Sequence, residues 1–374
     1  MNARMTGFDV HLQERCRRLT VRTAVPYDYF IGDRLLSNEF RDFLLSRKYS
    51  EAVVVADSNL AGGIGGEVAA AVRDYGRLRC QLVSFPAGER HKTLDTVAML
   101  LGEFAKFGLT RSGVVIAAGG GVTGDVAGFA AAVWLRGVPV IQFPTTLVAM
   151  IDSSIGGKTG VDLPEGKNLV GAFHQPSAVF AEARAVNSLS RQDLANGFAE
   201  MVKTAMIGDA ELFGHLRMQP QDMVCDGIIL RCAQIKAGIV AEDPQEHGNR
   251  RLLNLGHTAG HAIEQVSGYA IPHGEAVATG LAMVARAGVA AGITDEPYCR
   301  EVLQLLSSSG FAVRPPYPLE QLIPVMHGDK KCAGDRITLV VPQVPGRCVL
   351  HTIPVEELPA FWAGGAASEG CATP

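Results

Sequence analysis

The first half of the chain alternates short apolar, β-branched runs with segments of helical periodicity. Four runs have the composition of buried strands: 51–57 (EAVVVAD), 78–85 (LRCQLVSF), 112–118 (SGVVIAA) and 138–144 (VPVIQFP). Three segments between them have the helical repeat and end at glycine: 66–76, 91–108 and 124–137. Strand and helix in alternation form a parallel sheet covered on both faces. The pattern therefore predicts an α/β fold with a Rossmann-like, dinucleotide-binding domain over residues 1–186.

From about Ser190 the pattern becomes helical almost throughout. The longest helical stretches are 191–208 (RQDLANGFAEMVKTAMIG), 225–242 (CDGIILRCAQIKAGIVAE) and 275–292 (EAVATGLAMVARAGVAAG). Two late runs with strand composition, at 335–342 and 347–353, predict a small hairpin. We expect a mainly α-helical second domain over residues 187–362, and a disordered tail over 363–374.

Length and charge narrow the class of protein further. A chain of 374 residues is long enough for two domains. Its net charge of −4 gives no electrostatic reason to expect nucleic acid or a membrane surface as a partner. The start of the chain has no apolar run typical of a secretory signal, and no stretch is apolar enough to span a membrane. The eight cysteines are scattered without a CxxC pair, so we expect reduced thiols and a cytoplasmic location.

Histidines gather in one short stretch of the second half. His257 and His261 are four residues apart in a helical pattern and share one helix face, and His273 follows beside Pro272. With Glu200 upstream, these side chains suit a divalent metal of borderline softness, most plausibly zinc. The alternative is that one histidine caps a helix and another hydrogen-bonds in the core. A metalloprotease helix is excluded, because Thr258 stands where that motif needs glutamate.

A glycine loop follows the strand predicted at 112–118. Gly119, Gly121 and Gly124 have the G-x-G-x-x-G spacing, which lets backbone approach a pyrophosphate at the start of a helix. In the usual dinucleotide fingerprint the acidic residue comes after this loop. Here Asp57 and Asn59 come before it, at the end of an earlier strand, and could grip a ribose. The sequence thus predicts a nucleotide site with an unusual strand order. Glu89 and Lys92 either add contacts to it or belong to a solvated helix start.

Lysines and glycines are also combined in the segment 143–173. Gly157, Lys158 and Thr159 imitate the end of a Walker motif, but Asp152 occupies the position of its first glycine, so an NTPase loop is excluded. The loop still presents Lys158 and Lys167 beside Asn168. Two ammonium groups and an amide donor suit a phosphate monoester.

Several motifs together resemble those of the 3-dehydroquinate synthase family of NAD- and zinc-dependent sugar phosphate cyclases. They are GGGVTGDVAGFAAA, RGVPVIQFPTTL, DSSIGGKTGVDLPEGKNLVGAFHQP, GFAEMVK, NLGHTAGHAIE, HGEAVATG and DKK. The match runs in order from about Asp57 to Lys331. The resemblance implies an N-terminal dinucleotide domain, a helical domain that binds metal and substrate, and a homodimer.

The resemblance also implies roles for individual residues. The metal would be Zn²⁺ or Co²⁺, and its ligands would be Glu200, His257 and His273. His261 would face the substrate instead. The residues that contact NAD would be Asp57, Asn59, Glu89, Lys92, Gly119, Gly120, Gly121, Asp125, Thr145, Thr146 and Ser188. The residues that contact substrate would be Asp152, Lys158, Lys167, Asn168, Lys203, Lys236, Arg250, Asn254, His261 and Lys330, with Arg136 reaching across the dimer. Of these, Lys203, His261, Asp152, Arg250 and Asn254 would take part in catalysis. Gly334 follows the DKK motif one residue early, which leaves open whether Lys330 or Lys331 faces the substrate.

The implied reaction converts 3-deoxy-D-arabino-heptulosonate 7-phosphate into 3-dehydroquinate and phosphate, a step of the shikimate pathway. It combines transient oxidation by NAD, loss of phosphate, reduction and an aldol closure. Three alternatives remain at this point. A non-catalytic descendant that serves as a binding protein would be expected to lose metal ligands, and none of Glu200, His257 and His273 is missing. A related cyclase of secondary metabolism, such as aminodehydroquinate synthase, would keep the NAD and metal residues. A metal-dependent polyol dehydrogenase would release NADH, and the lysine loop argues against it.

Overall fold

The structure is a computed structural model that describes residues 10–12, 16–74, 78–218, 225–327, 332–333 and 335–367. Its internal contacts divide the chain into two compact units. Unit 1 comprises Met1–Leu189 and Cys225–Gln245, and unit 2 comprises Ser190–Val224 and Glu246–Pro374. The first break lies three residues beyond the predicted boundary at 186. Segment 225–245, which we predicted with the second domain, packs in unit 1 because its helix contacts the sheet there.

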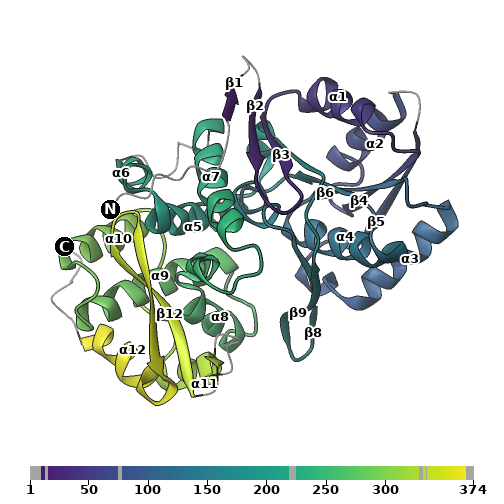
Figure 1. Cartoon of the computed structure of the whole chain (residues 1–374). Coiled ribbons are helices and arrows are strands. Elements are labelled where there is room, and N and C mark those ends of the chain that lie inside the picture. The colour runs from purple at the N-terminus through teal and green to yellow at the C-terminus, as the bar shows by residue number, and fades with distance from the viewer. Residues whose placement is uncertain are drawn as a thin grey trace. The chain divides into compact units, whose positions relative to one another are not determined.

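Unit 1 is built on one eight-stranded sheet (Figure 1). Its strands are β1 (Val10–Leu12), β2 (Cys16–Val21), β3 (Tyr27–Gly32), β4 (Glu51–Asp57), β5 (Arg79–Phe85), β6 (Val114–Gly119), β7 (Val140–Pro144) and β10 (Ala178–Glu182). They lie in the order β1-β2-β3-β10-β7-β6-β4-β5, and the six from β3 to β5 in that order are mutually parallel. The four predicted strands are confirmed as β4 to β7.

Helices cover both faces of this sheet. They are α1 (Glu39–Ser46), α2 (Ile64–Asp74), α3 (Leu94–Phe107), α4 (Gly121–Val133) and α7 (Asp226–Glu242). Short helical turns lie at η1 (Leu35–Ser37), η2 (Glu89–His91), η3 (Trp134–Arg136), η4 (Ala149–Ser153) and η5 (Ala183–Ser188). A separate hairpin, β8 (Lys158–Leu163) and β9 (Gly166–Phe173), packs on α4. The hairpin and strands β1 to β3 and β10 were not predicted.

Strand β4 shows why its sequence is apolar at almost every position. Val53 and Val55 pack with Phe104 of α3 on one face, whereas Ala52 and Val54 pack with the side chains of α1 and α2 on the other. Successive side chains of a strand point to opposite faces, so a strand covered on both sides loses the usual apolar–polar alternation.

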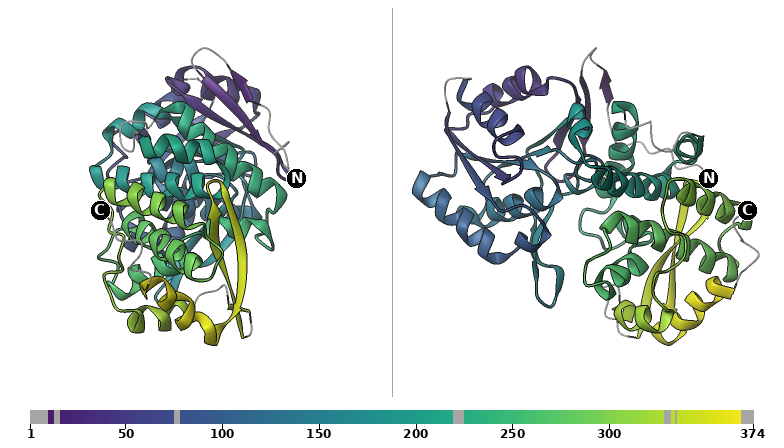
Figure 2. Two further views of the ribbon diagram at one scale, coloured as in Figure 1. Left: turned by 90° about the vertical axis from the view of Figure 1, so that its left-hand side faces the viewer. Right: turned by 180° about the vertical axis from the view of Figure 1, so that it is seen from behind.

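Unit 2 is mainly helical, as predicted. Its helices are α5 (Arg191–Gly208), α6 (Ala210–Met218), α8 (His257–Val266), α9 (His273–Ala290), α10 (Glu296–Ser308), α11 (Leu319–His327) and α12 (Leu358–Ala367), with short turns at η6 (Asn249–Asn254) and η7 (Val355–Glu357). Its strands are β11 (Cys332–Ala333), β12 (Arg336–Val344) and β13 (Arg347–Pro354). The predicted hairpin is confirmed as β12 and β13, which lie against the helices of the same unit in Figure 2. Helix α9 is central and packs on α5, α8, α10 and α12.

Two expectations about unit 2 need correction. The helical pattern around His257 does not extend back to Leu252, because Gly256 adopts a left-handed conformation (φ 76°) and helix α8 starts at His257. The expected tail begins at residue 363, but α12 continues to Ala367 and buries Trp362. Residues 368–374 lie outside the described part of the chain. None of the described helices is long and apolar enough to cross a membrane.

Candidate metal and nucleotide sites

Helix α5 carries a carboxylate into the interior of unit 2. The Ser190 hydroxyl caps the helix by accepting the Asp193 N–H at 3.1 Å, and ten residues later Glu200 is 1 % exposed. Lys203, one turn further on, places its Nζ atom 2.5 Å from Oε2 of Glu200 and is itself 2 % exposed. A buried carboxylate is costly unless nearby cations or ligands compensate it.

Two histidines from two other helices face the second oxygen of Glu200. Oε1 lies 3.5 Å from Nε2 of His257, at the start of α8, and 3.3 Å from Nε2 of His273, at the start of α9. One ligand atom from each of the three residues lies within 4.8 Å of the other two. His273 is the first residue of α9, and Pro272 occupies the N-cap position before it.

The donor set fits a divalent cation such as zinc. Oε1 of Glu200 is buried and receives no hydrogen bond from the described residues, so a positive ion between the three side chains would satisfy it. Burial lowers the pKa of His273, but the nearby carboxylates of Glu200 and Glu264 outweigh that effect and raise it to about 10. The site therefore has a strongly negative potential. Two imidazoles and one carboxylate leave a coordination position open, as in catalytic zinc sites.

His261 lies beside this set without belonging to it. Its ring centroid is 5.2 Å from that of His257 and 6.3 Å from that of His273. Among the described residues, the metal-binding group comprises Glu200, His257 and His273 and not His261. The geometry thus favours the set implied by the resemblance over the pair four residues apart.

Arg250 precedes the metal ligands on the turn η6. It is 1 % exposed, so the guanidinium lies in the interior of unit 2. Asn254, at the end of the same turn, donates from Nδ2 to Oε1 of Glu246 at 2.7 Å. Glu246 has a positive φ of 61°, which is uncommon for a residue other than glycine.

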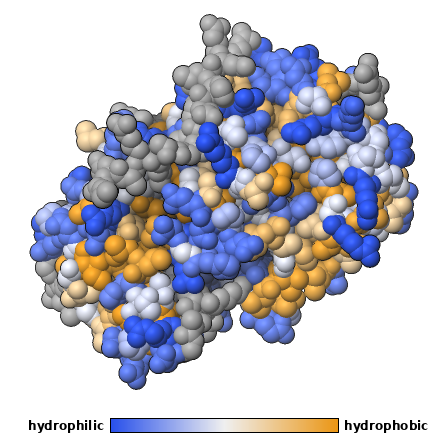
Figure 3. Space-filling view, viewed as in Figure 1, coloured by the Kyte–Doolittle hydropathy of each residue, from blue (hydrophilic) through white to orange (hydrophobic). Residues whose placement is uncertain are grey.

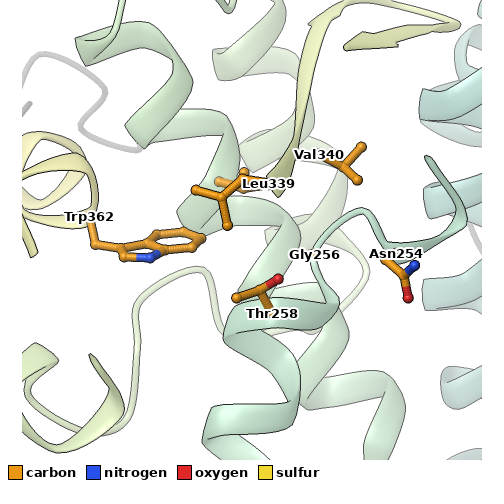
Figure 4. Close-up of a pocket in the computed structure, with 7 residues that line it drawn as sticks. Asn254, Gly256, Thr258, Leu339, Val340 and Trp362 are labelled. Carbon is orange, nitrogen blue, oxygen red and sulfur yellow. The ribbon is translucent and has the colours of Figure 1, made fainter. Parts of the chain in front are cut away.

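Residues around the start of α8 and on β12 line a small pocket within unit 2. Figure 4 shows the Trp362 indole, Leu339 and Thr258 turned toward one another on one side of it, and Asn254 and Val340 on the other. Its lining is mostly apolar and holds no charged side chain among the described residues. It therefore lacks the groups that a phosphorylated acid would need.

In unit 1, the residues expected to bind NAD follow the carboxyl ends of parallel strands. Asp57 ends β4, Gly119 ends β6, Thr145 and Thr146 follow β7, and Ser188 ends the turn after β10. Glu89 and Lys92 follow β5 in the same way. After β4, the chain adds β5 on one side of that strand and then returns to add β6 on its other side. The direction in which strands are added therefore reverses between β4 and β6. Crevices at such a reversal bind ligands in α/β sheets.

The start of α4 fits an anion at this reversal. Its N-cap residue is Gly120, and no side chain in the described part of the chain caps the helix there, which leaves backbone N–H groups for a pyrophosphate. The Thr123 hydroxyl lies 3.3 Å from Oδ2 of Asp57, and Asp57 Oδ1 accepts the Asn59 N–H at 2.9 Å. A Cβ on Gly119 would lie 2.4 Å from Oγ1 of Thr123, so this glycine permits close packing of strand and helix.

Residues expected to bind different ligands form one polar network. The Nζ atom of Lys92 lies 2.6 Å from Asp125 Oδ2 and donates to Asn168 Oδ1 at 2.6 Å. Burial lowers the pKa of Lys92, but the carboxylates of Asp125 and Glu89 raise it overall. Lys92 thus connects α4 with hairpin β8–β9.

The other cationic residues have different surroundings. Lys167 follows the turn of the same hairpin and lies 3.6 Å from Glu89, and Lys158 is exposed at the start of β8. Lys236 of α7 donates to both the carboxylate and the backbone carbonyl of Asp152. The alternative residues Lys330 and Lys331 lie outside the described part of the chain.

Two residues beside the metal set had no role in the sequence analysis. Glu264 lies seven residues after His257 on the same face of α8 and contacts His273. Asn196, one turn before Glu200, accepts the Gly274 N–H at 3.0 Å. The spacing from His257 to Glu264 could have signalled the first residue, but no local pattern could have signalled the second.

A search of solved structures identifies the class of protein that this fold and these sites define. The structure is similar to that of 2-epi-5-epi-valiolone synthase from Streptomyces hygroscopicus with NAD⁺ and Zn²⁺ bound, with a TM-score of 0.82 and 27 % identity. The similarity covers 91 % of this chain and 96 % of the other. The protein therefore has the fold of the dehydroquinate synthase-like sugar phosphate cyclases.

Sequence comparison identifies the family within that class. The 3-dehydroquinate synthase N-terminal domain matches residues 82–196, and the C-terminal domain matches residues 197–332. The 3-dehydroquinate synthase of Symbiobacterium thermophilum is 41 % identical over 308 residues, 80 % of this chain and 86 % of the relative. That of Xanthomonas campestris pv. campestris is 42 % identical over 344 residues, 87 % of this chain and 92 % of the relative. The chain belongs to the 3-dehydroquinate synthase family.

The geometry predicts different results for two neighbouring histidines. His257→Ala should abolish zinc binding because it removes one of three ligands, whereas His261→Ala should bind zinc normally and lose only turnover. Metal content after dialysis, with zinc or cobalt added back to chelator-treated protein, measures the difference. Equal loss of metal in both variants would show that the ligand pair is His257 and His261.

Proposed function

We propose that this protein is a 3-dehydroquinate synthase, a lyase that depends on NAD and a divalent metal. It would convert 3-deoxy-D-arabino-heptulosonate 7-phosphate into 3-dehydroquinate and phosphate in the shikimate pathway. The observation that carries the proposal is the convergence of Glu200, His257 and His273 in a chain of this family. The polar residues at the carboxyl edge of the sheet support it.

Two groups would come from outside the chain. NAD, held by the residues around Asp57 and Gly120, would accept a hydride from the substrate and later return it. Zinc or cobalt, held by Glu200, His257 and His273, would act as a Lewis acid toward substrate oxygen.

The chain's own residues would bind and orient a substrate that is charged at both ends. Arg250 is a buried guanidinium, suited to grip a carboxylate in bidentate fashion, and Asn254 follows it on the same turn. Lys158, Lys167 and Asn168 on hairpin β8–β9 would bind the phosphate and stabilise it as it leaves. Lys236 and Asp152 are paired in the described structure. When substrate binds, contacts with the substrate would replace part of that pairing.

Lys203 and His261 are the groups best placed to act near the metal. The Lys203 ammonium lies beside the Glu200 carboxylate, so it would donate to substrate oxygens close to the ion. His261 is exposed and its ring lies beside that of His257, so it can reach a substrate without displacing a ligand. We assign His261 to proton transfer at the leaving phosphate.

We also propose a homodimer in which Arg136 completes the partner's site. Leu135 and Arg136 both have positive φ values, 48° and 67°, a costly conformation for residues other than glycine. Four apolar side chains near this turn and on the neighbouring hairpin are exposed: Val133, Leu135, Leu169 and Phe173. Figure 3 shows an apolar area over hairpin β8–β9. An interface here would cover these side chains and present Arg136 to a second copy.

A cytoplasmic location is part of the proposal. Six of the cysteines, Cys16, Cys80, Cys225, Cys232, Cys299 and Cys348, are free thiols. Free thiols suit a reducing compartment.

The function predicts phosphate release that needs NAD without consuming it. With the heptulosonate phosphate, metal and a small amount of NAD, the enzyme should release one phosphate per substrate while absorbance at the NADH band stays flat. A coupled phosphate assay recorded alongside that absorbance is the measurement. NADH formed in step with product would make the protein a polyol dehydrogenase instead.

Arg250→Ala should weaken binding of the heptulosonate phosphate by about 2–5 kcal/mol, the range for truncating one partner of a buried charge pair. Arg251→Ala is the matched control, because the neighbouring arginine is exposed and should be neutral. Calorimetric titration with substrate and with NAD separates the effects, and NAD affinity should stay unchanged in both variants. If the wild type instead cyclises glucose 6-phosphate or sedoheptulose 7-phosphate and ignores the carboxylated sugar, the substrate assignment is wrong.

The trans role of Arg136 can be tested by mixing two inactive variants. Arg136→Ala and His257→Ala should each be inactive alone, but a mixed dimer would hold one site with both an intact metal set and the partner's arginine. Random reassociation should then restore about a quarter of wild-type activity, since half the dimers are mixed and each has one complete site. If Arg136 acts in its own chain, mixing restores nothing.

A further inference from the structure

The imidazole of His273 is contacted at both ring nitrogens. Nε2 faces Oε1 of Glu200 at 3.3 Å, and Nδ1 lies 3.4 Å from Oε2 of Glu264. Glu264 is 3 % exposed on α8, the helix that also carries His257. We propose that Glu264 is a positioning residue that orients His273 toward the metal and strengthens it as a ligand. The inference rests on the proposed metal dependence and adds a residue to it.

The two histidine ligands are oriented by different kinds of group. Nδ1 of His257 lies 3.0 Å from the backbone carbonyl of Leu255, so its Nε2 is the nitrogen that faces Glu200. In His273 the corresponding acceptor is a carboxylate. An N–H that donates to an acceptor fixes the tautomer with the other nitrogen unprotonated, and an anionic acceptor makes that nitrogen a stronger donor. His273 should therefore be the stronger of the two imidazole ligands.

The backbone of His273 is fixed separately from its ring. Asn196 of α5 accepts the N–H of Gly274, the next residue, at 3.0 Å. A Cβ on Gly274 would lie only 2.3 Å from Cα of Asn196, so the start of α9 packs directly on the helix that carries Glu200. This contact sets the position of the His273 backbone but does not itself determine the orientation of the ring. Glu264 supplies the contact that selects one orientation.

A purely structural role for Glu264 would give a different result. The backbone carbonyl of Glu264 accepts from the Ser267 hydroxyl at 2.8 Å and from the Tyr269 N–H at 2.7 Å, and both bonds survive side-chain substitution. A structural role would lower the unfolding temperature without changing how the folded protein holds a metal. A positioning role changes metal affinity and geometry in protein that is still folded.

The test compares three variants of the full-length protein with the wild type. Glu264→Ala removes the acceptor, Glu264→Gln keeps an amide oxygen that can still accept from Nδ1, and Glu275→Gln removes an exposed carboxylate in the first turn of α9. Zinc affinity is measured by competition with a chromophoric chelator, and the absorption spectrum of bound Co²⁺ reports ligand geometry. Circular dichroism melts confirm that each variant is folded.

Glu264→Ala should bind zinc about 10–100-fold more weakly, the usual effect of removing an outer hydrogen-bond partner of a metal-bound histidine. The cobalt spectrum should shift, Glu264→Gln should recover part of the affinity, and Glu275→Gln should match the wild type. Unchanged zinc affinity and cobalt spectrum in Glu264→Gln and Glu264→Ala would overturn the inference while leaving the proposed function intact. If Glu264→Ala does not fold, Glu264→Gln decides alone, because a role in positioning requires at least a spectral shift there. A wild type that binds neither zinc nor cobalt would overturn the proposed metal dependence itself.

Discussion

The buried carboxylate of Glu200 is the constraint around which unit 2 is organised. A carboxylate that is 1 % exposed must be compensated within the protein, and α5 alone supplies only Lys203. The remaining oxygen faces imidazoles from the first residues of α8 and α9. Those helices start where they do because Gly256 and Pro272 end the preceding segments. Helix starts are fixed by local backbone geometry, so they hold a metal ligand more rigidly than a loop would.

In unit 1, the polar groups gather at one edge of the sheet and not within it. Strands such as β4 are apolar on both faces, so polar side chains must come after the strand ends. Parallel strands end at one edge, which brings residues from five separate segments to the same rim. There they form contacts with one another, as the network of Lys92, Asp125 and Asn168 shows. A ligand at this rim would compete with these contacts, and the free energy of breaking them would reduce its affinity.

A cyclase and a polyol dehydrogenase would both use a nucleotide and a metal, so those two sites alone do not distinguish them. What separates the two enzyme classes is the set of charged residues that would contact the substrate. Hairpin β8–β9 presents cationic and amide groups outside the sheet, and η6 places a guanidinium in the interior of unit 2. The first feature suits a phosphate, and the second suits a carboxylate. Together with family membership, they make the phosphorylated sugar acid a better candidate than a neutral polyol.

The sequence by itself determined the four strands β4 to β7, the bounds of α5 and the hairpin β12–β13, because local hydrophobic periodicity and glycine or proline boundaries decide such elements. Motif resemblance determined the candidate residues. Tertiary structure decided the rest. Strand β10 and helix α7 belong to unit 1 only through contacts with distant segments, and no local period reports such partners. The burial of Arg250, the separation of His261 from the ligand set and the contact of Glu264 with His273 depend on how helices pack. Residues far apart in the chain meet only after folding, and spacing along the sequence does not encode the distance between them.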